Sequence, residues 1–278
     1  MEITVKTTEE ERIYDIPELG KLPSSTTILR LMDKSFVLVP WASKLVAEYF
    51  QNEIVDKIVS GEIKIEDIKK KDPKEFVKEA KSQPRHKKEK EADKGSRVHL
   101  VAEMIFKAML KGYKGKVDFE VEKDIEKPVE ALLKWISDYS VKPVDVEQIV
   151  WSKDFGGYAG RLDLVAEVEG YLLTIDIKSS SGIYAEFPLQ VASYDYAWKS
   201  MTGKTTEGIA ILRLDKETGM PEFKYWDIKQ ANDYLNEFGL WCLIWHMRND
   251  RKEREKALKK AQKEKEKLLK EKTDEEPF

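Results

Sequence analysis

Apolar residues along the chain recur at two spacings, one typical of helices and one typical of strands. Intervals of three and four residues predict a short helix after Ser24-Ser25-Thr26-Thr27 and longer helices over about 40–59, 95–110, 127–140, 188–201 and 228–249. Residues 62–94 carry few apolar side chains, and Pro73 and Pro84 predict breaks, so we expect separate helical fragments there. The charged segment 251–272 is predicted to extend the last helix into solvent.

Alternation of apolar and polar residues predicts strands in the second half of the chain. These strands cover 144–151, 158–168, 171–179, 208–214 and 222–228. Glu169-Gly170 joins the second and third of them as a tight hairpin turn, and residues 1–22 are predicted as one strand followed by a loop. The order of elements predicts an α/β fold: a central mixed sheet flanked by helices, with a mainly helical N-terminal section in front.

Composition limits the chemistry open to this chain. Its 278 residues, 41% hydrophobic and 36% charged, suffice for one large domain or two modest ones. A single cysteine, Cys242, and three histidines, His86, His99 and His246, exclude a disulfide framework, a four-cysteine iron–sulfur cluster and any multi-cysteine zinc site. Catalysis must therefore depend mainly on carboxylates, on lysine and on at most one isolated histidine.

The charge is unevenly distributed along the chain. The net charge of −3, from 49 Lys and Arg against 52 Asp and Glu, argues against a nucleic-acid partner when it is taken alone. Residues 69–97, however, hold twelve Lys and Arg against six Asp and Glu, a local charge of +6. Such a segment is usually a solvated face, but beside a suitable site it can steer a phosphate backbone.

The sequence also indicates a compartment. The acidic N-terminus lacks the apolar core of a secretory signal, and no apolar stretch approaches the roughly 18 residues that a membrane span needs. We therefore expect a cytoplasmic protein without a membrane partner. Heavy use of Lys and Glu favours a thermophilic source, microbial or viral.

The most informative stretch is the predicted hairpin, which carries acidic residues on both strands. If Glu169-Gly170 is a two-residue turn, Val168 pairs with Tyr171 and Asp163 lies directly opposite Asp176. Two carboxylates at that separation repel unless a cation neutralises them, and a hard divalent ion does so through carboxylate oxygens. Period-two alternation places Lys178 on the face of Asp176. The alternate positions are predicted to face apolar packing together: Leu162, Leu164, Ile175 and Ile177.

The order of these motifs resembles the PD-(D/E)XK nuclease superfamily, in its RecB-like branch and its phage- and mitochondrial-type exonucleases without an iron–sulfur cluster. The matching motifs are Gly95-x-x-x-His99, Gly160-x-x-Asp163, Asp176-x-Lys178 and Gln190-x-x-x-Tyr194, over roughly residues 95–200. The Ser/Thr-rich and Trp-Ala pairs within 22–50 are also similar to phage- and mitochondrial-type members. The resemblance implies a restriction-endonuclease-like core.

The resemblance further implies a metal site. Asp163 and Asp176, helped by the backbone carbonyl of Ile177, would bind one or two Mg²⁺ or Mn²⁺ ions. His99 would be an additional ligand, and Glu147 on the preceding strand could complete the set.

The same resemblance implies roles for the residues around the metal. Lys178 would orient or deprotonate the attacking water. Gln190, Tyr194 and Arg161 would contact DNA or order Lys178, although an aromatic residue on a helix, such as Tyr194, is as often part of the core. Helix spacing, apart from the resemblance, places Glu103 one turn beyond His99 on the same face, where a hydrogen bond to that histidine is favoured over a role as a metal ligand.

The resemblance implies a divalent-metal-dependent deoxyribonuclease, an exonuclease acting on single-stranded DNA or DNA ends in repair, recombination or replication. Two alternatives stay open: a non-catalytic DNA-end-binding or recombination partner, and an endonuclease of the same superfamily, which would normally be a dimer. A monomer is otherwise favoured, with DNA and replication or recombination proteins as partners. We expect residues 1–94 to pack on or arch over the active site, 95–250 to form the nuclease core, and 251–278 to form a charged helical or disordered tail.

Overall fold

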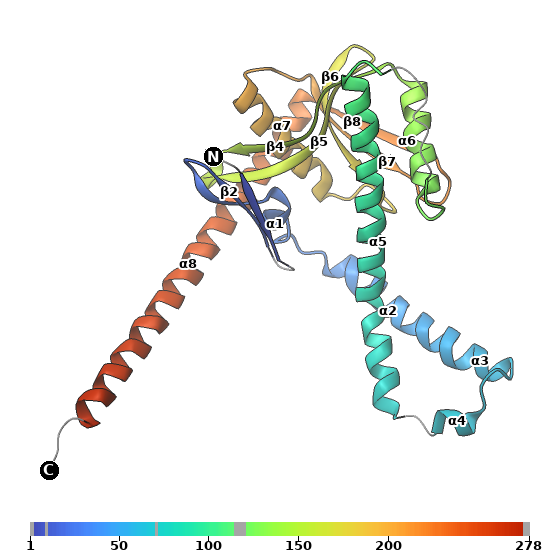
Figure 1. The fold of residues 1–278 in the computed structure, drawn as a ribbon, viewed down its shortest axis with the longest axis vertical. Helices are drawn as coiled ribbons and strands as arrows, with labels where there is room; N and C mark the ends of the chain where they lie inside the picture. The colour runs from blue at the N-terminus through green and yellow to red at the C-terminus, as the bar shows by residue number, and fades with distance from the viewer. Residues whose placement is uncertain (1–2, 9–10, 70–71, 114–120, 275–278) are drawn as a thin grey trace.

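A mixed β-sheet forms the centre of the computed structural model, which describes residues 3–8, 11–69, 72–113 and 121–274 (Figure 1). Its five strands lie in the order β4-β5-β6-β7-β8. They are β4 (Val141–Ser152), β5 (Tyr158–Val168), β6 (Tyr171–Lys178), β7 (Gly208–Leu214) and β8 (Pro221–Asp227). Only β6 and β7 run parallel among these neighbours, so the α/β fold with a mixed sheet is confirmed.

Helices cover both faces of this sheet. On one face, α5 (Pro73–Leu110) and α6 (Glu126–Asp138) pack through Phe106 and Trp135 against strand residues such as Ile175. On the other face, α7 (Glu186–Thr202) and α8 (Ile228–Asp274) pack through Trp198 and Phe238. The result is a three-layer α/β/α core. Beyond Asn249, α8 continues without a break and residues 251–267 are exposed, in agreement with the predicted solvated extension (Figure 1).

The N-terminal section begins with a second small sheet. The strands β1 (Thr4–Thr7), β2 (Arg12–Ile16) and β3 (Gly20–Pro23) are antiparallel, so the prediction of one strand and a loop over 1–22 is wrong. Strands this short provide too few alternating positions to be recognised. The sheet packs through Tyr14 and Leu22 against Ala159 of β5. It is followed by α1 (Ser25–Leu29), whose predicted N-cap is confirmed because the Ser24 hydroxyl accepts from the Thr27 N–H.

Helix α5 is continuous over 38 residues, so the predicted break at Pro84 and the predicted helix start at Gly95 are wrong. Pro73 lies in the first turn, where its missing N–H costs nothing, and the Asp72 side chain caps that end. Pro84 lies inside the helix. Neighbouring helices stabilise this stretch: Ala80 is buried, and the Tyr49 hydroxyl donates to the Glu79 carboxylate.

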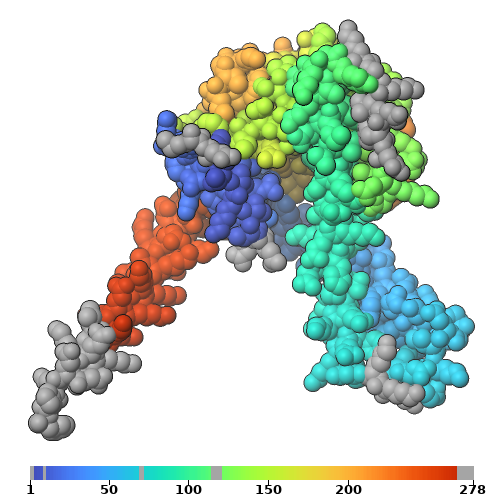
Figure 2. Space-filling model, viewed as in Figure 1, coloured from blue at the N-terminus to red at the C-terminus, as the bar shows by residue number. Residues whose placement is uncertain are grey.

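The helices that precede α5 form a projecting hairpin with its first half (Figure 1). They are α2 (Ser35–Phe50), a π-helical turn (Gln51–Val55), α3 (Asp56–Val59) and α4 (Ile65–Lys69). We call these elements, together with residues 73–94 of α5, the helical arm. The predicted helix end at Gly61 is confirmed by its left-handed φ of 76°. Figure 2 shows the arm standing clear of the core on the side away from α8. None of the described helices is long and apolar enough to cross a bilayer.

Candidate metal centre

The hairpin of β5 and β6 has the predicted register. Glu169 and Gly170 both adopt positive φ, 51° and 88°, as a two-residue hairpin turn requires. Backbone pairing runs from Val168 and Tyr171 to Leu164 and Ile175. The next residue on β5 is Asp163 and the next on β6 is Asp176, and the regular backbone pairing of the two strands ends before them. There the Ile177 N–H donates to Asp163 Oδ2 at 2.7 Å, so the acidic side chain takes the place of a ladder bond.

Glu147 lies on β4 between the residues that pair with Leu162 and Leu164, which places it beside Asp163. Its φ of 55° is left-handed, a conformation that is uncommon for a residue with a side chain and that often stores strain at functional sites. The strand changes face at this point. Val146 packs in the core under α5 and α6, whereas Val150 packs in the core under α7 and α8.

The same change of face occurs on β5 and corrects one expectation. Leu162 and Leu164 are both fully buried, but Leu162 belongs to the core under α7 and α8 and Leu164 to the core under α5 and α6. They do not face one apolar layer together, as strict alternation would require. Strand β5 thus changes the core that it faces at Asp163, as β4 does at Glu147, and the two acidic residues lie side by side at this point.

Three residues from three elements converge at this point. His99 of α5, Glu147 of β4 and Asp163 of β5 each present a ligand atom, and these atoms lie within 4.8 Å of one another. His99 Nδ1 is 3.5 Å from Asp163 Oδ1. The side chains of Glu147 and Asp163 are only 12% and 11% exposed. Two carboxylates and an imidazole therefore share a small volume, which is open to solvent at the 31% exposed side chain of His99.

Asp176 and Lys178 lie next to this cluster. Lys178 Nζ is 2.6 Å from Asp176 Oδ2, a close ion pair between an ammonium group and a buried carboxylate. Gln190 of α7 contacts both groups: its Nε2 is 3.3 Å from Asp176 Oδ1, and its Oε1 is 3.4 Å from Lys178 Nζ. The ring of Phe187 lies 4.9 Å from Lys178 Nζ. Nothing in the sequence pattern singled out Phe187, because an aromatic residue early in a helix is usually core.

Tyr194 is buried in the core and also supports the site. Its hydroxyl accepts from Gln190 Nε2 at 2.9 Å, which fixes the amide that contacts Asp176 and Lys178. Its ring lies directly over Gly160, where a Cβ atom would come within 2.2 Å of a ring carbon. The glycine of the Gly160-x-x-Asp163 motif is therefore required by the close approach of this ring.

Burial and the neighbouring charges shift the pKa values of the ionisable groups in the site. Burial, reinforced by the charge of Asp163, raises the pKa of Glu147 to about 7. Burial also raises the pKa of Asp176 to about 6, with Lys178 opposing and Asp163 adding to the rise. Burial lowers the pKa of His99, but the adjacent Asp163 and Asp176 charges outweigh it and hold the pKa at about 9. Burial would raise the pKa of Asp163, yet the His99 and Lys178 charges and the Ile177 N–H hold it below its usual value.

These properties fit a divalent cation. Burial and the charge of Asp163 raise the pKa of Glu147 and of Asp176 and so oppose ionisation of these two groups, whereas His99 and Lys178 hold the pKa of Asp163 low. A hard dication relieves this crowding, since it prefers several oxygen ligands and tolerates an imidazole. The donor set contains no thiolate, which matches Mg²⁺ or Mn²⁺ better than a soft metal.

Two further predicted residues lie close to the centre without joining it. Arg161 is exposed, with its Nη1 3.7 Å from Glu147 Oε2. Glu103 pairs with Lys107 at 2.5 Å, and within the described part of the chain it makes no hydrogen bond to His99. The Glu103 carboxylate thus pairs with the lysine one turn further along α5.

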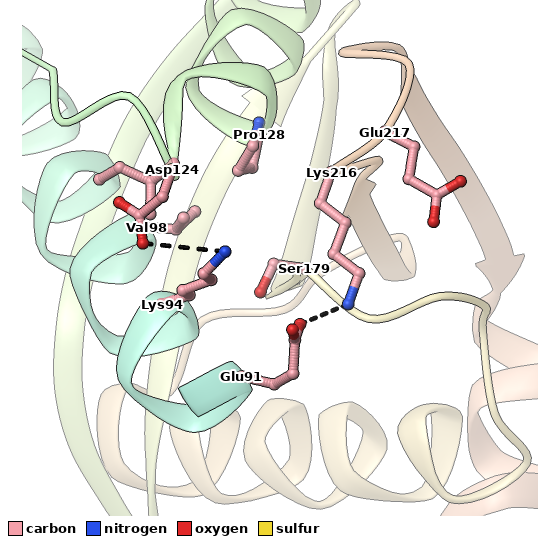
Figure 3. A pocket seen from close by; sticks show the side chains of 9 residues that line it. Glu91, Lys94, Val98, Asp124, Pro128, Ser179, Lys216 and Glu217 are labelled. Carbon is pink, nitrogen blue, oxygen red and sulfur yellow. Dashed lines mark hydrogen bonds and ion pairs between the residues drawn. The ribbon is translucent and has the colours of Figure 1, made fainter. Parts of the chain in front are cut away.

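A neighbouring pocket, of about 170 Å³, lies between α5, α6 and the β7–β8 turn (Figure 3). Ser179, directly after Lys178, lines it, but His99, Asp163 and Asp176 do not. Its two lysines are already paired, Lys94 with Asp124 and Lys216 with Glu91 (Figure 3). These pairs attach α5 to the core just before His99, so the pocket contributes to the position of that histidine.

An α/β/α core whose central strands bring carboxylates and a lysine together defines a class of metal-dependent hydrolase. A model of the PD-(D/E)XK nuclease superfamily matches residues 73–278, from the first residue of α5 onward. The chain belongs to this superfamily, whose members are nucleases that use divalent metals. No curated protein matches the chain significantly.

Proposed function

We propose that this protein is a divalent-metal-dependent deoxyribonuclease that acts as an exonuclease on single-stranded DNA or DNA ends. The observation that carries the proposal is the meeting of Asp163, Asp176 and Lys178 beside His99 and Glu147. A module that only bound DNA would have no use for buried, mutually repelling carboxylates, because DNA is itself an anion.

Each residue of the centre has a role in this proposal. His99, Glu147 and Asp163 would hold a Mg²⁺ or Mn²⁺ ion, with Asp176 and the Ile177 carbonyl on the remaining side. The bound ion supplies Lewis acidity, which lowers the pKa of a water ligand and polarises the scissile phosphate.

The lysine and its neighbours complete the proposed machinery. Lys178 orients or deprotonates the attacking water and stabilises the charge that develops on the phosphate. Gln190 holds Lys178 and Asp176 in their relative positions, and Tyr194 holds Gln190. Arg161, exposed at the edge of the centre, is placed to contact the DNA backbone.

The helical arm supports an action on ends, as in the RecB-like branch. Because α5 carries both the arm and His99, a strand that follows α5 to the centre passes beside the arm. In this proposal, residues 1–94 limit access to a free end. We propose residues 95–250 as the nuclease core, joined to the first section by the continuous helix α5.

The metal role can be tested without measuring cleavage. A ligand at 100 times its Kd stabilises a protein by about 2.7 kcal/mol, which corresponds to a rise in Tm of roughly 5–10 °C for a chain of this size. We expect Mn²⁺ to raise the Tm of the wild type by that amount and to raise the Tm of Asp163→Asn by less than half as much. Thermal denaturation with and without EDTA measures both shifts. Asp138→Asn, which removes a surface carboxylate on α6, is the control and should behave as the wild type. Equal Mn²⁺-induced rises in Tm in all three proteins would show that Asp163 is not a metal ligand.

The requirement for an end gives a second prediction. With Mn²⁺, we expect linear single-stranded DNA to be degraded at least 100-fold faster than a circle of the same sequence, since a circle has no end to pass the arm. Gel analysis of the two substrates under identical conditions measures the ratio. Equal cutting of both would identify an endonuclease. DNA binding without degradation of either would favour a non-catalytic end-binding protein.

A further inference from the structure

One face of α5 carries a row of cations that leads to the metal centre. The row consists of Lys74, Lys78, Lys81, Arg85 and Lys88, which we call the basic stripe. Their spacing of four, three, four and three residues keeps them within a strip about 80° wide on a helix of 3.6 residues per turn. The same strip continues through Ala92 and Ser96 to His99, at intervals of four, four and three residues. Because α5 is a single helix, the stripe and His99 lie on one face.

The rest of the arm packs on the opposite side of α5. Glu79, which pairs with Tyr49 of α2, and the buried Ala80 both lie away from the stripe. All five residues of the stripe are exposed. No acidic residue lies within the strip between Lys74 and His99, and Glu89 at its margin is 3.7 Å from Arg85.

Several α5 cations outside the stripe are engaged in ion pairs. Away from the stripe, Lys87 pairs with Glu91, Lys94 with Asp124, and Arg97 with Asp93, Glu122 and Asp124. In the described part of the chain, the four lysines of the stripe make no ion pair with a carboxylate. Their charge is therefore available to a partner. Lys70 and Lys71, which add to the positive charge in the sequence, lie outside the described residues.

We propose that the basic stripe binds the phosphodiester backbone of a single nucleic-acid strand and guides it along α5 to the metal centre. This inference rests on the proposed nuclease function. A single row of cations, of which the four lysines make no ion pair within the described residues, complements the single row of phosphates on one strand, and its continuity with His99 indicates where the strand leads.

The dimensions give the length of strand required. At 1.5 Å per residue, Lys74 to Lys88 spans about 21 Å and Lys88 to His99 about 16 Å. With about 3.4 Å per nucleotide of stacked strand, the full path holds about eleven nucleotides. A tetranucleotide at the metal centre would not reach the stripe, whereas a 30-mer would cover it.

Two double variants of the same helix test the proposal. Lys81→Gln/Lys88→Gln removes two charges from the stripe, and Lys87→Gln/Lys90→Gln removes two from the opposite face. Binding of a fluorescent 30-nucleotide single strand is measured by anisotropy in EDTA over a series of salt concentrations. We expect the stripe variant to bind about tenfold more weakly at moderate salt and to lose about 1.4 from the slope of log K against log salt. The control variant should stay within twofold of the wild type, and binding of a tetranucleotide should be equal in all three proteins.

The outcomes separate this inference from the proposed function. If both double variants lose affinity equally, or neither does, the stripe is not the binding face and the inference is overturned, even where the wild type degrades DNA with Mn²⁺. If only the stripe variant loses affinity, the inference stands. If the wild type then degrades no DNA with Mn²⁺ or Mg²⁺, the stripe binds DNA in a protein without nuclease activity. The nuclease proposal is then contradicted, while the inference about the stripe is not.

Discussion

Replacing Asp176 by Asn should lower the rate of DNA cleavage by roughly 10²–10³-fold. Asp176 Oδ2 is a buried oxygen 2.6 Å from Lys178 Nζ, and a neutral amide at this position can neither neutralise a dication nor form an ion pair with the ammonium group. Losses of this size are usual when a group that stabilises charge in the transition state is removed. Initial rates on labelled single-stranded DNA with saturating Mn²⁺ measure the effect.

The Tm of Asp176→Asn shows whether a loss of cleavage comes from the missing carboxylate or from unfolding. Since the pKa of Asp176 is raised to about 6 in the folded protein, its ionised form lowers the free energy of unfolding above that pH. Asn removes that cost, so in EDTA at pH 7.5 we expect the Tm of Asp176→Asn to equal or exceed that of the wild type. Asp138→Asn should keep full activity. A variant that is folded and retains more than a tenth of the wild-type rate would exclude Asp176 from catalysis.

Lys178→Met should lower the cleavage rate by roughly 10²–10⁴-fold, the range found for groups that transfer a proton or stabilise developing charge. Methionine preserves much of the length of the side chain and its packing near the Phe187 ring, but removes the ammonium group. Metal binding should survive, because the proposed ligands are oxygens and an imidazole. The Mn²⁺-induced rise in Tm is therefore expected to be at least as large as in the wild type.

The same substitution at another lysine shows whether the lower cleavage rate is specific to Lys178. Lys224→Met changes an exposed lysine on β8, and should leave the rate within twofold of the wild type. If Lys178→Met and Lys224→Met cleave at the same rate, the ammonium group beside Asp176 has no part in the reaction. If Lys178→Met instead loses the metal-induced rise in Tm, its role is in metal binding.

The sequence predicted the hairpin of the centre because local chemistry determines it. A two-residue turn with a glycine accommodates positive φ, and alternation within the strands then sets the register of the ladder from Leu164 to Val168. The positions of Asp163, Asp176 and Lys178 follow directly from that register. Helix capping at Ser24 is equally local.

The parts that the sequence did not predict depend on contacts between distant segments. The continuity of α5 through Pro84 depends on the packing of α2 against Ala80 and Glu79, which no local rule contains. The left-handed backbone of Glu147, and the change of face that places Leu162 and Leu164 in different cores, arise where β4 and β5 twist under helices from both sides. The basic stripe likewise depends on this continuity, because its residues share one face only if α5 is a single helix.

Digestion of linear single-stranded DNA labelled at either end, with Mn²⁺, tests the proposed reaction and its site together. The wild type should shorten the strand progressively from one end, so that one label is released early and the other marks a ladder. EDTA should stop the reaction, and folded Asp176→Asn should leave both labels on full-length DNA. Intact DNA after incubation with the wild type and Mn²⁺, or an equal ladder from Asp176→Asn, would contradict a metal-dependent nuclease centred on Asp163, Asp176 and Lys178.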